Sequence, residues 1–187
     1  MMHPSVSVPP AVEKAIQKPS RRDSALLLLL AWFIPLGIHL IPWDGAKPLG
    51  ASMLPAFWAA LVAAYLYGTG VGLLVGLSAP LLNFLVLGFP PSHAVFLLAA
   101  ETVVFVLVLQ PLLRRFPRFW WSAAFGYMMA KVASTGLEVA PAFPHLEAAG
   151  ALLLQSLRMA WPGWLMLTVI NAVLVKAFPP PDDWDAT

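Results

Sequence analysis

The chain has 187 residues, of which 60% are hydrophobic and only 11% are charged, and its mean hydropathy is +0.79. Because an ordinary soluble domain carries about 25% charged residues, this composition excludes a water-soluble globular protein and indicates a chain embedded in lipid. The formal net charge of +2 comes mostly from Lys and Arg beside predicted helix ends, where membrane topology explains them, so we expect no nucleic-acid partner. The absence of cysteine excludes disulfides, thiolate metal sites and a cysteine nucleophile.

The first 23 residues are polar, contain proline, and carry basic residues shortly before the first apolar run. A cleaved signal peptide would have a shorter polar lead and a small-residue cleavage site after its apolar region, and the stretch from Ile34 to Trp43 offers neither. We therefore expect residues 1–23 to form a disordered cytoplasmic tail, followed by a first transmembrane helix that is retained.

Apolar segments then follow one another closely along the chain, separated mainly by proline and glycine. Each is close to the ~20 residues needed to cross ~30 Å of hydrocarbon at 1.5 Å per residue. The sequence therefore predicts an all-α membrane protein, with a six-helix transmembrane domain over residues 24–176 and a cytoplasmic tail over residues 177–187. The predicted spans are Ser24 to Pro42, Leu49 to Tyr67, Thr69 to Gly88, Ser92 to Leu113, Phe119 to Val139 and Gly150 to Val175.

The distribution of basic residues predicts the orientation. With the N-terminus inside, the cytoplasmic side receives nearly all basic residues and the outer loops keep only Lys47. Both termini are thus predicted to be cytoplasmic, in a multi-pass protein of the inner (cytoplasmic) cell membrane. The basic residues on the cytoplasmic side are Lys14, Lys18, Arg21, Arg22, Arg114, Arg115, Arg118 and Lys176.

Three charged residues lie deep in apolar spans: Glu101, Lys131 and Arg158, on the fourth, fifth and sixth spans. A charge at the centre of a transmembrane helix costs roughly 2.5 to 3.5 kcal/mol on insertion scales and is a functional candidate by default. Counting from the outer ends of their spans, all three fall about 12 to 14 Å below the outer surface. This common depth predicts that they face one polar cavity open to the outside.

Neighbouring polar and aromatic residues extend this predicted site. Tyr127 shares a helix face with Lys131, Gln155 and Trp161 flank Arg158, and Asn83 lies on the third span. Such a lining suits a small polar heterocycle or a carboxylate.

A purely structural alternative is an ion pair of Glu101 with Lys131, or with Arg158, that only fixes the register of the helices. Two cations against one carboxylate leave a positive charge over, which favours an anionic group on a ligand or a ligand that splits the pair. The charge of that ligand stays open.

Several kinds of chemistry have no signature in this sequence. There is no G-x-x-x-x-G-K-[ST] loop for a nucleotide and no G-x-S-x-G nucleophile motif. No paired carboxylates lie at the depth of Glu101, so we expect no enzyme and no catalytic residue. The histidine and glutamate residues near the outer rim lack metal-ligand spacing, and we expect no metal and no cofactor.

The region from Pro48 to Pro55, through Gly68 to Gly76 and on to Asn83, resembles the proline-bearing second helix and glycine-rich third helix of an S component of an energy-coupling factor (ECF) transporter. The resemblance extends over about residues 24 to 176. It implies capture of a vitamin from the outer side by the last three helices, with the first loop, including Trp43, closing the site. It further implies a transmembrane coupling subunit and two ATPase subunits as partners. The small pair Ala25 and Ala31 departs from the family's Ala-x-x-x-Ala docking pattern.

Taken together, the sequence predicts a membrane subunit that captures a vitamin or cofactor precursor for uptake. The alternative is a non-transporting membrane scaffold of the rod-shape morphogenesis type. An intramembrane enzyme or an ion-coupled carrier are further alternatives.

Overall fold

The structure is a computed structural model that describes residues 49–87, 92–139 and 146–179, together with scattered positions between 22 and 42. The tail predicted over residues 1–23 lies outside the described residues apart from Arg22, and the tail predicted over residues 177–187 does so from residue 180 onward. In the first predicted span, the described Leu26, Leu30 and Phe33 are helical and about half exposed, at 49%, 52% and 53%. Every described element is a helix, which confirms the all-α prediction.

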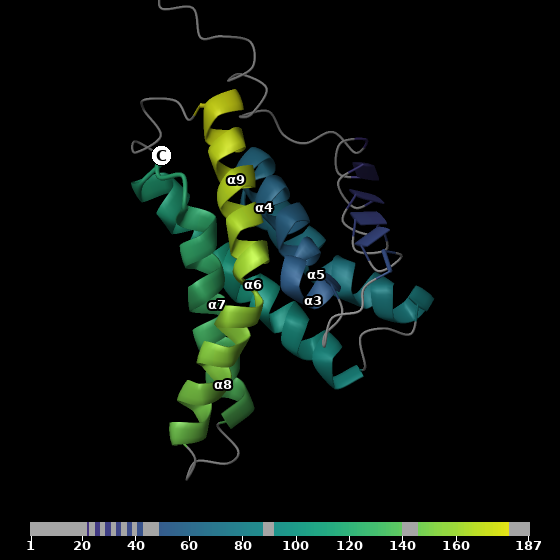
Figure 1. Ribbon diagram of the computed structural model, residues 1–187. Helices are drawn as coiled ribbons and strands as arrows, with labels where there is room; N and C mark the ends of the chain where they lie inside the picture. Colours follow the sequence, from purple (N-terminus) through teal and green to yellow (C-terminus); the bar gives the residue numbers. More distant parts are fainter. Residues whose placement is uncertain are drawn as a thin grey trace, which may run out of the picture.

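The helices follow the predicted segments with two interruptions (Figure 1). The third, fourth and fifth predicted segments are each one helix, namely α5, α6 and α7. The second predicted segment is divided into α3 and α4, and the sixth is divided into α8 and α9. The bounds are α3 Leu49–Met53, α4 Pro55–Tyr67, α5 Thr69–Leu87, α6 Ser92–Arg115, α7 Ser122–Val139, α8 Leu146–Met159 and α9 Trp161–Ala177.

The break between α3 and α4 lies at Leu54, whose backbone is left-handed with φ 57° and ψ 43°. Pro55, which begins α4, disfavours the right-handed helical region for the residue before it. A non-glycine residue with positive φ is uncommon and persists where its surroundings hold it. Here Leu54 packs against Gly163 on α9, where an added Cβ would lie 2.5 Å from Leu54 Cγ and 2.7 Å from the Ser52 carbonyl oxygen.

The break between α8 and α9 bends the chain by 61° at Ala160. Pro162, in the first turn of α9, has no N–H to continue the hydrogen-bond ladder of α8. The indole N–H of Trp164 donates instead to the Leu157 carbonyl at 3.2 Å, giving one carbonyl at the end of α8 a partner. The sixth predicted segment is therefore bent at Ala160 into two helices.

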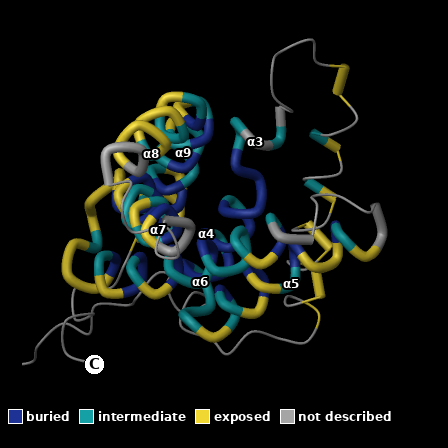
Figure 2. Tube along the Cα trace, turned by 90° about the horizontal axis from the view of Figure 1, so that it is seen from below, coloured by how far each residue is buried: buried dark blue, intermediate teal, exposed yellow. Residues whose placement is uncertain are grey.

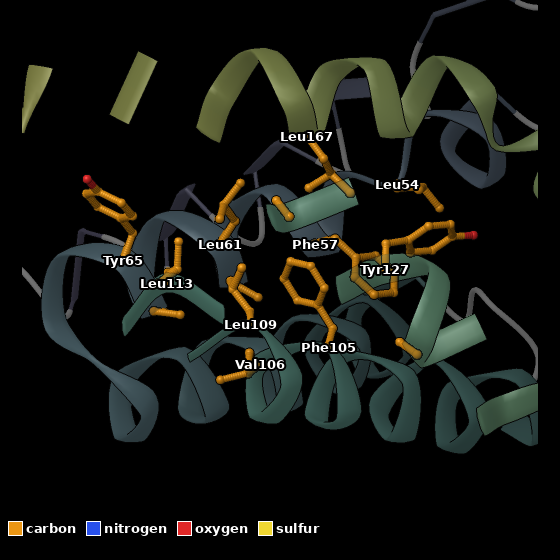
Figure 3. Close-up of a cluster of buried hydrophobic side chains, with 14 of the residues drawn as sticks. Leu54, Phe57, Leu61, Tyr65, Phe105, Val106, Leu109, Leu113, Tyr127 and Leu167 are labelled. Atoms are coloured by element: carbon orange, nitrogen blue, oxygen red, sulfur yellow. The ribbon is translucent and has the colours of Figure 1, made fainter. Parts of the chain in front are cut away.

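Helix α4 lies at the centre of the described bundle, in contact with α5, α6 and α9, while α7 packs against α6, α8 and α9. Buried residues concentrate along α4, and the outward turns of the surrounding helices are exposed (Figure 2). The core includes a ring cluster in which Phe57 packs edge-on against Phe105 and Tyr127, with centroids 5.3 Å and 5.1 Å apart (Figure 3).

Buried side chains also join neighbouring helices by hydrogen bonds. The Thr102 hydroxyl donates to the Gly76 carbonyl at 2.8 Å, linking α6 to α5. The Gln110 amide donates to the Ala64 carbonyl at 2.6 Å, linking α6 to α4. The Tyr65 hydroxyl donates to the carbonyl of Phe178 at 2.8 Å and so ties α4 to the end of α9. In each case a polar group that lacks water finds its partner on another helix.

The surface and the interior show an unusual division of side chains. Large apolar side chains are exposed on α5, α6, α7, α8 and α9, including Leu85 on α5 at 75%, Phe96 on α6 at 73% and Val173 on α9 at 58%. Polar side chains are buried among the helices instead. The buried polar or charged residues among those described are Asn83, Glu101, Thr102, Gln110, Ser122, Ser134, Thr135 and Asn171. Large apolar patches on the outside are the mark of a surface that meets lipid or another protein.

By length and composition, one described helix could cross a membrane, over Ala94–Arg115. A second candidate exists if Gly150–Met159 and Trp161–Ala177 count as one bent span. The apolar stretches Pro55–Tyr67 and Thr69–Leu85 are shorter. The arrangement of six spans therefore stays a prediction.

The close approach of α4 and α5 gives a test of the packing. An added Cβ on Gly72 would lie 2.7 Å from Ala64 Cβ and 3.0 Å from Ala64 Cα, whereas nothing lies within 4 Å of one on Gly70. We expect Gly72→Ala to destabilise the protein by about 1 to 3 kcal/mol, because the two backbones must move apart. Thermal unfolding in detergent measures the effect.

Gly70→Ala is the matched control, because it adds the same methyl group to the same helix without a contact. It should leave the melting temperature unchanged or raise it, since alanine favours the helix. Equal melting temperatures for the two variants would contradict the close approach of α4 and α5.

Candidate functional site

A carboxylate buried between two helices forms the centre of the candidate site. Glu101 on α6 is 5% exposed, and its Oε1 accepts a hydrogen bond from Lys131 Nζ at 2.7 Å. The same oxygen accepts a second bond from the Ser134 hydroxyl, also at 2.7 Å. Because Lys131 and Ser134 are three residues apart on α7, both side chains reach the same face of α6.

The local packing brings α6 and α7 close enough for this contact. Gly126 on α7 lies against the ring of Phe105, where an added Cβ would be 3.4 Å from the ring carbon Cδ2. Phe105 is one turn after Glu101, and Gly126 is five residues before Lys131. The absence of a side chain at Gly126 thus lets α7 approach α6 one turn away from the ion pair.

The side chains of Lys131 and Glu101 are exposed to different extents. The side chain of Lys131 is 17% exposed and that of Glu101 only 6%. Moving both charges out of water is costly, and the attraction between them repays that cost only where good hydrogen bonds complete the pair. The hydrogen bond from the Ser134 hydroxyl gives the Glu101 carboxylate a second partner. The ammonium group is the more accessible end of the pair.

Tyr127 lies one turn before Lys131 on α7 and is 2% exposed. Its ring packs against Phe57, while its hydroxyl points away from the ring cluster (Figure 3). Thr135, also buried, follows Ser134 on the same helix. The predicted grouping of Tyr127 with Lys131 is therefore present as a continuous face of α7.

The ion pair lies at about the level of the break between α8 and α9. At the other end of α7, the Asn171 amide of α9 donates to the carbonyls of Phe119 and Trp120 at 3.1 Å and 2.8 Å. Helices α7 and α9 run in opposite directions (Figure 1). Counted from this contact, Trp161 lies ten residues before Asn171, and Lys131 lies eleven residues after Trp120. Each separation corresponds to about 15 to 17 Å along the helix direction, so Trp161 and Lys131 lie at about the same level.

Arg158, two residues before the break, is exposed and forms no ion pair with another described residue. The structure therefore places Arg158 near the predicted level without bringing it to Glu101, which pairs with Lys131 instead. The reason lies in the helix order: α7 lies directly beside α6, whereas α8 packs against α7 and α9. Gln155 and Trp161, predicted to flank Arg158 in the site, are exposed as well, Trp161 at 60%.

Asn83 on α5 is 8% exposed, and its Oδ1 has no hydrogen-bond partner among the described residues. It lies seven residues beyond Gly76, whose carbonyl binds Thr102, the neighbour of Glu101. Two helical turns, about 10 Å, thus separate Asn83 from the level of the ion pair. Trp43 lies outside the described residues.

Asn171 and Gln110 are buried residues with hydrogen bonds between helices or to the turn before α7, and the sequence analysis did not identify them. Both lie within predicted apolar spans, and considering amide side chains as well as charged ones in those spans would have identified them. No group of three or more His, Cys, Asp or Glu side chains that could hold a metal ion occurs in the part of the chain that the structure describes.

Comparison of the chain with protein-family models, with curated proteins and with solved structures gives no match. The site is therefore interpreted from its own chemistry.

Removing one partner of the ion pair should destabilise the protein more than removing both partners. Lys131→Met leaves the buried Glu101 carboxylate without its cation, and we expect a loss of about 3 to 5 kcal/mol. The double variant Glu101→Gln with Lys131→Met removes both charges and should recover a large part of that loss. Unfolding measured for both single variants and the double variant closes the thermodynamic cycle.

Lys176→Met is the matched control, because Lys176 is exposed at the end of α9. It should change stability by less than about 0.5 kcal/mol. A double variant no more stable than Lys131→Met would show that the unpaired Glu101 carboxylate is not the cause of the loss in the single variant.

Proposed function

We propose that this chain is a multi-pass membrane protein with six spans and cytoplasmic termini. The support is the combination of exposed apolar side chains with buried polar ones, which suits an apolar solvent. Helix α6 is long enough to cross a bilayer, and the bent pair of α8 and α9 would make a second crossing if the two helices form one span. α3 and α4 together make up the predicted second span, and α5 and α7 the third and fifth.

The absence of cysteine from the sequence makes this arrangement testable by single-cysteine labelling. In intact cells, an impermeant maleimide should label Lys47→Cys, which the topology puts outside. It should label Arg115→Cys and Lys176→Cys only after the membrane is opened, because both are expected inside. Labelling of all three positions in intact cells, or of none after opening, would contradict the proposed topology.

Within that membrane protein, we propose a substrate-capture subunit for uptake of a vitamin or cofactor precursor. The observation that carries the proposal is the buried Glu101 and Lys131 pair, whose ammonium group is partly accessible beside a broken helix. An ionisable residue in a membrane span is a functional-site candidate by default, because burying its charge is costly. Broken helices form the binding sites of many transporters, because their free ends supply backbone hydrogen bonds.

A ligand with an acceptor and a donor matches the two halves of this pair. Its carboxylate or ring oxygen would take the place of Glu101 on Lys131, and its N–H group would bind Glu101. The hydroxyls of Tyr127 and Ser134 add neutral hydrogen-bonding groups on the same helix. Because the sequence contains no nucleotide loop, the energy for uptake would have to come from elsewhere. The resemblance to an S component of an energy-coupling factor transporter implies a separate coupling subunit and two ATPase subunits for that purpose.

A membrane scaffold is the second candidate, and one observation favours it. The Glu101 carboxylate already has two partners within the chain, at 2.7 Å each, so the pair is satisfied without a ligand. A scaffold uses such a pair to fix the register of two helices.

Ligand retention separates the two candidates. We expect protein purified in mild detergent to release a stoichiometric small molecule on denaturation, identified by mass spectrometry. Glu101→Gln, which has the same shape without the charge, should bind that compound at least tenfold more weakly, since a hydrogen bond to a charged group is worth about 1.5 to 3 kcal/mol.

Lys176→Gln is the matched control and should keep full affinity. If no compound is released and a panel of vitamins gives no thermal shift, the scaffold becomes the better explanation. Undiminished binding by Glu101→Gln would remove Glu101 from the site.

A further inference from the structure

The turn between α6 and α7 presents basic and aromatic side chains together. Arg114 and Arg115, in the last turn of α6, are exposed. Phe116, Trp120 and Trp121 follow and are 53%, 56% and 44% exposed. We call residues 114–121 the basic aromatic turn.

This turn is held in a fixed shape by hydrogen bonds. Phe116 N–H donates to the Leu112 carbonyl at 2.8 Å, and Phe119 N–H donates to the Phe116 carbonyl at 3.0 Å. The buried amide of Asn171 donates to the carbonyls of Phe119 and Trp120, tying the turn to α9. The exposed side chains are thus presented by a backbone with its own internal support.

The position of the turn relates it to the membrane boundary. The clearest candidate span, Ala94–Arg115, ends at the first residues of the turn. The second candidate, if the bent pair is one span, ends at Ala177 beside the exposed Lys176. The start of α7 and the end of α9 lie at the same end of the molecule (Figure 1). Basic residues therefore gather where two hydrocarbon-spanning segments would leave the bilayer.

We propose that the basic aromatic turn binds the headgroup phosphate of an anionic phospholipid. A guanidinium group offers a fork of N–H donors that matches phosphate oxygens, and the exposed Arg114 and Arg115 offer two such forks on consecutive residues. Exposed tryptophans are amphipathic and settle at the level of lipid headgroups. An acidic protein would satisfy the arginines but would leave the apolar rings without a partner. This inference rests on the membrane placement in the proposed function.

Lipid discs of defined composition provide the test. The purified protein is placed in discs of phosphatidylcholine alone or of phosphatidylcholine with phosphatidylglycerol, and its melting temperature is measured. We expect phosphatidylglycerol to raise the melting temperature of the unaltered protein. Arg114→Gln and Arg115→Gln should each reduce this increase, and the double variant should abolish it. High salt should weaken the effect, because the contact is at the surface.

Arg158→Gln is the charge-matched control, since Arg158 is exposed far from the turn on α8, and it should keep the full increase. The conservative pair Arg114→Lys and Arg115→Lys keeps the charge and should keep part of the effect. This pair preserves the test even if the glutamine double variant folds poorly.

Three outcomes would overturn the inference. The first is an equal increase in the unaltered protein and in a folded double glutamine variant. The second is an equal increase when inorganic phosphate is added to neutral discs, which would assign the contact to free anions. The third is failure of the unaltered protein to enter any disc. That last result would overturn the proposed membrane function as well, whereas the first two leave it standing.

Discussion

The contact between Glu101 and Lys131 is the interaction on which the arrangement of α6 and α7 depends. An ion pair in an apolar interior is stable only when both groups meet at hydrogen-bond distance, so it permits one register of the two helices and penalises the others. The register with Lys131 Nζ 2.7 Å from Glu101 Oε1 also places Gly126 against Phe105. From there the ring of Tyr127 reaches Phe57 on α4. One polar contact therefore determines which apolar surfaces meet.

The other buried polar side chains act in the same way on neighbouring helix pairs. In lipid, burying apolar surface does not drive helices together, because the lipid tails are equally apolar. In the proposed membrane setting, small residues and hydrogen bonds would supply the specificity, and both occur here. Gly72 allows α5 to lie against Ala64, Thr102 binds the Gly76 carbonyl, and Gln110 binds the Ala64 carbonyl. Gly72 and these hydroxyl and amide groups thus act together where α4, α5 and α6 meet.

The sequence was sufficient to predict helices because each apolar run is long and ends at proline, glycine or a basic residue. It could not predict that two runs are broken, since a proline inside an apolar run is compatible with a kink, a new helix start or a lipid-facing position. Pro55 and Pro162 both lie in the first turn of a new helix. The sequence could not predict either that Glu101 pairs with Lys131 rather than with Arg158. Depth along each helix follows from counting residues, and counting alone grouped Arg158 with Glu101 and Lys131. The direction of a side chain depends on which helices are neighbours, and α8 lies beside α7 and α9.

The two helix breaks are related to each other and to the ion pair. Gly163, just after the break at Ala160, is the residue that packs against Leu54, the break between α3 and α4. Both interruptions therefore lie together, at about the level where Lys131 is 17% exposed and Glu101 only 6%. A ligand that reaches the pair would meet the more exposed Lys131 side chain first, and it would displace the carboxylate only if it is itself a good acceptor. Glu101 would then keep Ser134 and gain a free oxygen for a donor on the same ligand. The uneven cover of one ion pair thus favours ligands that carry an acceptor and an N–H donor a few bonds apart.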